Sequence, residues 1–502
     1  MEKTNTNVEI SRLLEYGLQR GLIAPEDKVY AANRMLALLG LREFEPQPVE
    51  EELHTPVEPL ERLCQFAAEA GLIEPDTRDG RDQFDTELMN CLMPRPSQVV
   101  REFYSLYEKD KQAATDYYYQ LARSSNYIRV DRIEKDRMWT APTPYGDLVI
   151  TINLSKPEKD PKAIAAAKNA PQSGYPKCAL CRENEGYLGS ANQAARGNHR
   201  LIPLELGGEP WFLQYSPYVY YNEHCIVLSH EHRPMKVSRQ SISRLLEFVT
   251  FLPHYFVGSN ADLPIVGGSI LTHDHFQGGR YEFPMAKAPI REKVCFPGFE
   301  DVEAGIVHWP MSVIRLRGKE AQRLVDLADK ILTAWREYSD ESAEILAYTE
   351  GTPHNTITPI ARRRGEDYEL DLVLRNNRTT PEHPLGLFHP HAEYHHIKKE
   401  NIGLIEVMGL AILPPRLLTE TGLLEQALKD PAQAQEIMAR PEMEKHQAWY
   451  EELKAAGAGE GDTQRAIQES IGVIFGKILG NAGVYKDTEE GREAFRRFCS
   501  SL

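Results

Sequence analysis

A short stretch near the middle of the chain constrains the fold more than any other. Residues 267–279 read GGSILTHDHFQGG, with a glycine pair at each end and no helical period. Apolar and β-branched residues between turn-forming glycines predict an extended segment. Because side chains alternate along a strand, we expect His273, His275 and Gln277 on one side of it.

Two imidazoles and a carboxamide on one face predict a site rather than a core, since each buried polar group would need its own partner. A neutral imidazole can attack phosphorus or take up a proton near pH 7. A glutamine amide can donate to a phosphoryl oxygen, and the glycines let the backbone approach a ligand closely. The structural alternative is a histidine-rich strand that is satisfied by internal hydrogen bonds.

The order His-x-His-x-Gln resembles the active-site strand of the galactose-1-phosphate uridylyltransferases, in the histidine-triad superfamily. Simple histidine-triad hydrolases carry a third histidine where Gln277 stands. The run HHIKKENIGLIEVMGLAILP at residues 395–414 is more specific. It resembles the second, bacterial class of the family, which is longer than the common class and has an additional helical N-terminal region. The resemblance covers nearly the whole chain.

Pattern and resemblance together predict an α+β fold, with two histidine-triad-like antiparallel sheet halves flanked by helical N-terminal and C-terminal regions. The expected divisions are a helical region over 1–125, a first half with the nucleophile strand over 126–287, a second half over 288–416 and a helical region over 417–502. Period and turn signals predict helices over 60–71, 97–123, 238–251 and 320–336 and strands over 148–154, 225–228, 280–284, 313–316, 357–361 and 368–374.

Cys178 and Cys181 form a Cys-x-x-Cys pair, and a metal held there would need two further ligands. Histidines follow at His230, His232 and His273. In the better-known class of the family, zinc is held by such a pair, a histidine in this region and the first histidine of His-x-His. The resemblance therefore implies a structural zinc on Cys178, Cys181, His232 and His273, with His232 preferred over His230 by alignment. Two buried thiols without a metal are the alternative.

Five residues are candidates for substrate binding. Lys156 and Lys159 follow the predicted strand at a spacing where the family has basic residues that contact nucleotide phosphates, with arginines in the better-known class. Two solvated lysines are the alternative. Asn260, Gly268 and Ser269 resemble the asparagine and Gly-x-Ser that precede His-x-His in the family, although plain turn chemistry also accounts for them.

A second His-x-His stands at His389 and His391, and it could bind a second metal, shape the hexose site or pack in the core. The order of strands and helix before it resembles the first half faintly. The basic run at residues 395–399 could meet a sugar phosphate. An exposed basic surface is the alternative there.

The bulk composition argues against some classes of protein. A net charge of −16 argues against a general nucleic-acid or membrane-surface binder. No apolar run approaches membrane-spanning length, and the N-terminus is acidic and polar rather than a signal peptide. An odd count of 7 cysteines without framework spacing fits a reduced cytoplasm. The family commonly forms dimers, so a homodimer is expected.

The resemblance implies a UDP-glucose–hexose-1-phosphate uridylyltransferase of galactose metabolism that needs no organic cofactor. UDP-glucose and galactose 1-phosphate would give glucose 1-phosphate and UDP-galactose through a covalent uridylyl group on His275, steadied by Gln277. Ping-pong kinetics follow from such an intermediate. The alternatives are a dinucleotide phosphorylase or nucleotide hydrolase of the same superfamily, and a zinc-stabilised binding protein without catalysis.

Overall fold

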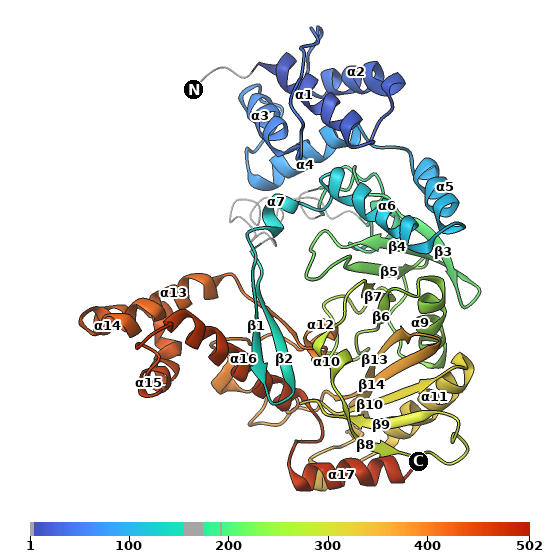
Figure 1. The fold of residues 1–502 in the computed structure, drawn as a ribbon, viewed down its shortest axis with the longest axis vertical. Coiled ribbons are helices and arrows are strands. Elements are labelled where there is room, and N and C mark those ends of the chain that lie inside the picture. The colour runs from blue at the N-terminus through green and yellow to red at the C-terminus, as the bar shows by residue number, and fades with distance from the viewer. Residues whose placement is uncertain (1–4, 155–173, 191–192) are drawn as a thin grey trace. The chain divides into compact units, whose positions relative to one another are not determined.

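The chain forms two units that interleave along the sequence (Figure 1). The computed structural model describes residues 5–154, 174–190 and 193–502, and its helices and antiparallel strands give an α+β fold. The first unit comprises residues 1–135, 155–219 and 223–233. The second comprises residues 136–154, 220–222 and 234–502. Among the described residues, none of the helices combines the length and apolar character that a membrane span requires.

The first unit begins with helices whose ends follow local sequence signals. The side chain of Asn5 accepts hydrogen bonds from the first turn of α1, which ends before Gly21 at φ +66°. Pro25 opens the 3₁₀ turn that leads into α2. The helices of this unit are α1 (Thr6–Gln19), α2 (Lys28–Leu38), α3 (Val57–Glu69), α4 (Arg78–Asn90), α5 (Pro96–Tyr107), α6 (Lys111–Ser124) and α7 (Val130–Ile133).

Three antiparallel strands of the first unit are neighbours in the order β3 (Ile202–Leu206), β4 (Glu209–Tyr215) and β5 (Cys225–Ser229). Alternate residues of β3 are buried, as expected for a sheet with one covered face. Helix α6 is tied to this sheet by two tyrosines: Tyr118 donates to the carbonyl of Leu213 at 3.2 Å, and Tyr215 donates to that of Thr115 at 3.1 Å.

The second unit contains a larger antiparallel sheet, in which β7 carries the candidate nucleophile. Hairpin β13–β14 at its centre is buried over most of its length. The strands follow the order β7 (His275–Gly279), β6 (Phe256–Gly258), β13 (Asn355–Arg364), β14 (Asp367–Asn376), β10 (Val313–Gly318), β9 (Glu303–Val307) and β8 (Ile290–Val294). A two-stranded ribbon of β11 (Tyr348–Thr349) and β12 (Thr352–Pro353) stands apart.

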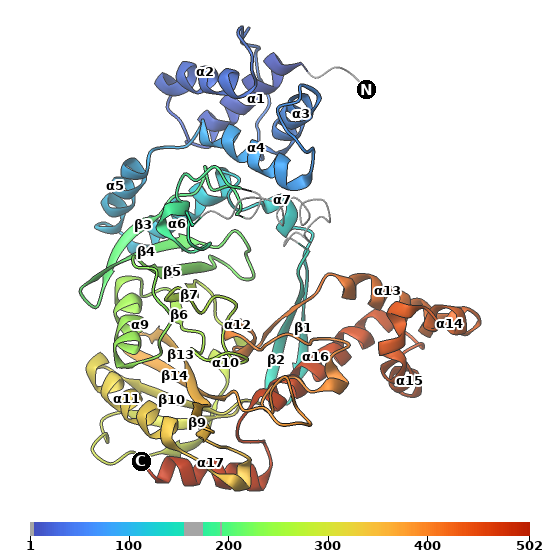
Figure 2. The ribbon, with the colours of Figure 1, turned by 180° about the vertical axis from the view of Figure 1, so that it is seen from behind.

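Helices α9 (Arg239–Phe251) and α11 (Ala321–Glu337) cover one side of this sheet (Figures 1 and 2). Their apolar stripes are buried, and the indole N–H of Trp335 donates to the carbonyl of Thr356 on β13 at 2.9 Å. Ser238 caps α9 by accepting from the N–H of Ser241.

A second sheet of this unit joins β1 (Arg137–Thr143), β2 (Gly146–Ile152) and β15 (Leu410–Leu413), with β15 parallel to β2. Helix α16 packs on β1 so closely that a Cβ at Gly472 would lie 2.1 Å from that of Ala141. The other helices of this unit are α10 (Pro284–Lys287), α12 (Leu404–Val407), α13 (Arg416–Lys429), α14 (Pro431–Met438), α15 (Gln447–Ala455), α16 (Thr463–Ala482) and α17 (Glu489–Ser500).

The structure differs from the sequence expectations at three places. The helix expected over 97–123 is two helices, because the side chain of Asp110 accepts from the N–H of Gln112 and starts α6 anew. Helix α4 was not expected, since its sequence is mostly polar. The strand expected over 280–284 is wrong: β7 ends at Gly279, and Pro284 starts the short helix α10.

Candidate active site

The strand that carries the His-x-His-x-Gln motif is shorter than expected and begins at His275 itself. Residues 267–274 approach it as a loop, so His273 precedes the strand. Gly267 forms an isolated bridge with Ala261, and a Cβ at Gly267 would lie 2.6 Å from the carbonyl oxygen of Ala261. This close packing holds the loop out of the sheet and requires glycine at that position.

The ring of His275 is buried, with 5% of the residue exposed. Its Nδ1 lies 2.8 Å from the carbonyl oxygen of His273. A carbonyl can only accept, so Nδ1 carries the hydrogen and Nε2 keeps its lone pair. Burial lowers the pKa of His275 to about 4, against which the bond to His273 acts more weakly. The ring is therefore a neutral imidazole at pH 7, with one nitrogen available to attack.

Gln277 follows two residues later on β7, opposite Gly258 of β6, and is half-buried. Because side chains alternate along a strand, Gln277 and His275 project from the same face of β7. The carboxamide thus lies on the side of the sheet that carries the imidazole. It can donate hydrogen bonds without taking up the proton of a neighbouring acid.

Asn260 and Gly268 are in contact, whereas Ser269 is exposed in the loop. Asn260 is 3% exposed, and its Oδ1 accepts from the backbone N–H of Leu404 at 2.9 Å. A Cβ on Gly268 would lie 2.8 Å from Asn260 Nδ2, so the backbone of Gly268 rests on this carboxamide. Two of the five residues predicted to bind substrate therefore form one packed group around the loop before His275.

Sequence reasoning missed the segment that holds Asn260 in place. Residues 401–404 lead into α12, and the carbonyl of Ile402 accepts from Arg375 Nη2 at 2.8 Å. Arg375 is 1% exposed, and burial lowers its pKa to about 10. The signal available in the sequence was the arginine that directly follows the apolar run 372–374, since a sheet interior tolerates a charge only with a bonding partner.

The two cysteines of the Cys-x-x-Cys pair form a small group in the first unit. Their sulfur atoms lie 3.6 Å apart, and Cys181 Sγ lies 3.2 Å from Nδ1 of His232. The donor atoms of these three residues all fall within 4.8 Å of one another. Asn184 fixes the turn by donating from Nδ2 to the carbonyls of Cys178 and Cys181, each at 2.8 Å. Burial raises the pKa of Cys178 to about 11.

This group fits a tetrahedral thiophilic metal. Zinc–sulfur bonds of about 2.3 Å place two sulfur ligands roughly 3.8 Å apart, near the separation found here. His232 lies beside the two cysteines, whereas His230 is exposed. Nε2 of His230 lies 2.6 Å from Nη1 of Arg182, and its ring stacks on Phe212. The three residues can thus hold a metal ion. His273, the fourth residue of the predicted set, belongs to the second unit and is 1% exposed.

Other predicted residues have different surroundings. Lys156 and Lys159 lie outside the described residues. Lys398, in the run expected to meet a sugar phosphate, is buried instead, with Nζ 3.1 Å from Glu406. Its charge is therefore neutralised within the protein.

The second His-x-His is satisfied by hydrogen bonds within the second unit. His389 Nε2 lies 3.2 Å from Asn401 Oδ1. Nδ1 of His391 accepts from the amide of Asn481 at 2.9 Å, and its Nε2 donates to the carbonyl of Leu387 at 3.1 Å. Within the described ranges, neither ring joins a group of potential metal ligands. This arrangement accords with the packing role considered for the pair.

Comparisons with known proteins identify the relatives of this sequence. Residues 21–234 match the model for the N-terminal domain, and residues 247–448 that for the C-terminal domain, of galactose-1-phosphate uridyl transferase. The galactose-1-phosphate uridylyltransferase of Clostridium acetobutylicum is 52% identical over 99% of this chain and 100% of that protein. That of Halalkalibacterium halodurans is 53% identical over 100% of both.

Similarity to solved structures is weaker. Yeast Ap4A phosphorylase Apa2 in complex with Ap4A shares 12% identity, covers 65% of this chain and 92% of its own, and gives a TM-score of 0.34. A likeness of that size carries no argument about the function of the chain.

Proposed function

The chain belongs to the galactose-1-phosphate uridylyltransferase family, and from this premise we propose that it transfers UMP reversibly between hexose 1-phosphates. UDP-glucose and galactose 1-phosphate are converted to glucose 1-phosphate and UDP-galactose, as in the Leloir route of galactose metabolism. The enzyme is a nucleotidyltransferase. One observation supports this reaction best: a buried, neutral imidazole at His275 with Nδ1 bonded and Nε2 bearing a lone pair.

The first half of the reaction makes a covalent intermediate. Nε2 of His275 attacks the α-phosphorus of UDP-glucose, forming a P–N bond while the bond to the bridging oxygen breaks. Glucose 1-phosphate leaves with that oxygen and the bonding electrons. It is a stable anion, so no strong general acid is needed. The ring becomes positively charged as the bond forms, and the carbonyl of His273 stabilises that charge through Nδ1–H.

The second half reverses these events with another sugar. A phosphate oxygen of galactose 1-phosphate attacks the uridylyl phosphorus, the P–N bond breaks, and its electrons return to Nε2. His275 is again neutral, and UDP-galactose departs. Free enzyme and uridylyl-enzyme alternate, which predicts ping-pong kinetics.

Six further residues are assigned to the phosphates and the nucleotide in this proposal. Gln277 donates to a nonbridging oxygen of the phosphorus under attack. Asn260 and Gly268 bind the nucleotide part with Ser269, which is supported by the contact between the first two. Lys156 and Lys159 supply the positive charge that UDP-glucose requires.

The metal of this proposal is a structural zinc on Cys178, Cys181, His232 and His273. It is supported by the spacing of the first three donors, and the family resemblance supplies His273 as the fourth ligand. Bound zinc would supply a closed cross-link rather than chemistry, since all four positions are protein ligands. It would fix His273, whose carbonyl orients His275.

The proposal also extends to the state of the protein in the cell. A cytoplasmic location is supported by the free thiols of all seven cysteines in the structure. The family implies a homodimer, and light scattering coupled to size-exclusion chromatography measures this directly.

The decisive experiment is the intact mass of the protein after incubation with UDP-glucose alone, quenched at alkaline pH because phosphoimidazoles are acid-labile. A mass increase equal to one uridylyl group, absent from His275→Ala, is the expected result. Free UMP without an adduct would indicate a nucleotide hydrolase. If release of the uridylyl group required inorganic phosphate and not a sugar phosphate, the chain would be a phosphorylase. If neither an adduct nor turnover is observed, the chain would be a binding protein without catalysis.

A further inference from the structure

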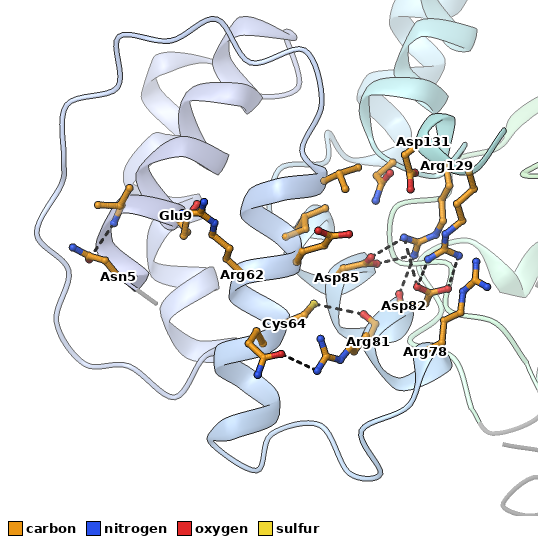
Figure 3. A pocket seen from close by; sticks show the side chains of 17 residues that line it. Asn5, Glu9, Arg62, Cys64, Arg78, Arg81, Asp82, Asp85, Arg129 and Asp131 are labelled. Atoms are coloured by element: carbon orange, nitrogen blue, oxygen red, sulfur yellow. Dashed lines mark hydrogen bonds and ion pairs between the residues drawn. The ribbon is translucent and has the colours of Figure 1, made fainter. Parts of the chain in front are cut away.

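A large open cavity lies within the first unit, between α1, α3, α4 and residues 126–132 (Figure 3). Its volume is about 1170 Å³, at the upper end of the roughly 300–1,000 Å³ that small-molecule sites occupy. None of the residues assigned to uridylyl transfer lines it. The helical N-terminal region thus has a candidate site of its own.

Arginines and carboxylates line one end of this cavity. Arg129 donates from Nη1 and Nη2 to the two oxygens of Asp85, each at 2.7 Å. Arg132 makes the same paired contact with Asp82, at 2.8 and 2.5 Å. Figure 3 shows Arg78 extending toward this end as well. The planar side chains are held in place by these paired bonds before any ligand arrives.

These pairs leave Arg78 without a paired carboxylate among the described residues. Arg78 lies close enough to Asp82 to lower the pKa of that carboxyl, together with the larger effects of Arg132 and Arg129. Asp82 is already paired with Arg132, and Arg78 makes no hydrogen bond or ion pair with any described residue. The five N–H groups of Arg78, and those of Arg132 that do not reach Asp82, bond to none of the described residues. Asp131 also lines this end beside Arg129, so three arginines face three carboxylates there and the charges balance. The unpaired donors of Arg78 and Arg132, rather than an excess of positive charge, suit a phosphate.

Asn126 provides an independent observation that points to a ligand. It lines the cavity, is 5% exposed and has a left-handed backbone at φ +58°. Its carboxamide makes no hydrogen bond to the residues that the structure describes. The polar atoms of this carboxamide open into the cavity, where a ligand can bond to them. The left-handed backbone is ordinary for an asparagine just after the end of α6, so only the unbonded amide points to a binding role.

We propose that this cavity binds a small organic phosphate. The phosphate lies on Arg78 and Arg132, while Asn126 bonds to hydroxyl groups of the remainder. Asp131, a partly exposed carboxylate in the lining, offers an acceptor for further hydroxyls and disfavours a phosphate beside itself. The site shares no residue with the proposed transfer reaction, so it stands whether or not that reaction is confirmed.

Arginine footprinting of the full-length protein tests this site at the residue concerned. Phenylglyoxal modifies accessible arginines, and peptide mass spectrometry reports the rate at Arg78. Glucose 1-phosphate should slow that rate by the factor 1 + [L]/Kd, about tenfold at ten times Kd. Glucose alone at equal ionic strength should leave it unchanged. Arg101, exposed on α5 and outside the cavity, is the internal control.

The same assay with inorganic phosphate separates the contribution of the phosphate from that of the sugar. Protection by both indicates that the phosphate is the recognised group, and protection by glucose 1-phosphate alone indicates that the hydroxyls are also required. The proposal is overturned if neither compound slows labelling of Arg78, or if both slow Arg78 and Arg101 equally.

Two variants that each add one negative charge make the test specific to the cavity. Asn126→Asp keeps the shape and tolerates the positive φ, but places a negative charge in the cavity. It should raise the phosphate concentration for half-protection of Arg78 about tenfold. Asn33→Asp, on the exposed side of α2, makes the same charge change elsewhere and should leave that concentration unaltered. Equal protection in Asn126→Asp and wild type would exclude Asn126 from the site.

Discussion

The side-chain oxygen of Asn260 accepts a 2.9 Å hydrogen bond from the backbone N–H of Leu404, a residue 144 positions later in the sequence. The bond joins the loop before the nucleophile to the C-terminal run that is most typical of the bacterial class. Gly268 rests on the same carboxamide. One asparagine therefore links the two most informative sequence motifs in space.

Replacement of His275 by alanine should lower the rate of uridylyl exchange by at least about 10⁴-fold, because no other group takes over the nucleophile. Circular dichroism and the melting temperature should change little, since the ring is held by one local bond. His230→Ala, at an exposed histidine, is the matched control and should retain full activity. A variant of His275 with a tenth of the normal rate would rule it out as the nucleophile.

Replacement of Gln277 by alanine should reduce kcat about 10²-fold with a smaller change in KM, as expected for a donor that acts mainly on the developing charge. Steady-state kinetics with UDP-glucose and galactose 1-phosphate give both constants. If KM alone rises, Gln277 binds the ground state and the transition state equally, and its assigned role is wrong.

Replacement of Cys178 by serine should remove bound zinc and lower the melting temperature together, because a structural metal site contributes to folding directly. Elemental analysis of the purified protein measures zinc per chain. Cys295→Ser, at an exposed thiol, is the control and should keep the metal. Equal zinc content in the Cys178 variant and in the wild type would refute the assignment.

Replacement of Gly268 by alanine should impair catalysis through Asn260. The added methyl would lie 2.8 Å from Asn260 Nδ2 and displace the carboxamide that holds Leu404. A loss of about tenfold in kcat/KM is expected, equivalent to roughly 1.4 kcal/mol. Gly480→Ala, where a Cβ meets nothing within 4 Å, is the control. In an Asn260→Ala background the effect of Gly268→Ala should largely vanish, and simple additivity would contradict the coupling.

Stability should fall with pH below about 6.5 in part because of His199. Burial and the charge of Arg196 lower the pKa of His199 to about 3, so the folded protein keeps this ring neutral while the unfolded chain protonates it. The stabilisation is fully present above the unfolded pKa and is lost as the pH falls, by up to about 1.4 kcal/mol per pH unit. Melting temperatures at pH 7 and pH 5 measure the loss. His199→Gln should show a shallower pH dependence, and an unchanged slope would exclude His199 as a cause.

Elements with a clear apolar period and a local stop signal were predictable from the sequence. Helix α9 starts after Ser238, and hairpin β13–β14 turns directly after Arg364, at Gly365 with φ +62°. Helix α4 was not predictable in this way, because its apolar positions are few and become buried only through packing with other helices. Local pattern carries no information about partners supplied by tertiary structure.

The candidate site, too, was predictable from the sequence only in part. The grouping of Cys181 with His232 was implied by the family resemblance, and the placement of His275 on a strand was indicated by the motif itself. The start of that strand was not indicated, because it depends on how Gly267 packs against Ala261. The buried pairing of Lys398 with Glu406 was likewise hidden, since a run of basic residues normally indicates an exposed surface.

The partner that orients His275 is a main-chain carbonyl, and every amino acid has one. A substitution at position 273 can remove the imidazole there and still leave the oxygen that holds Nδ1–H. A substitution of the side chain at position 273 therefore leaves the orientation of the His275 ring unchanged. Related sequences can carry another side chain at position 273 and still keep the tautomer of His275 unchanged.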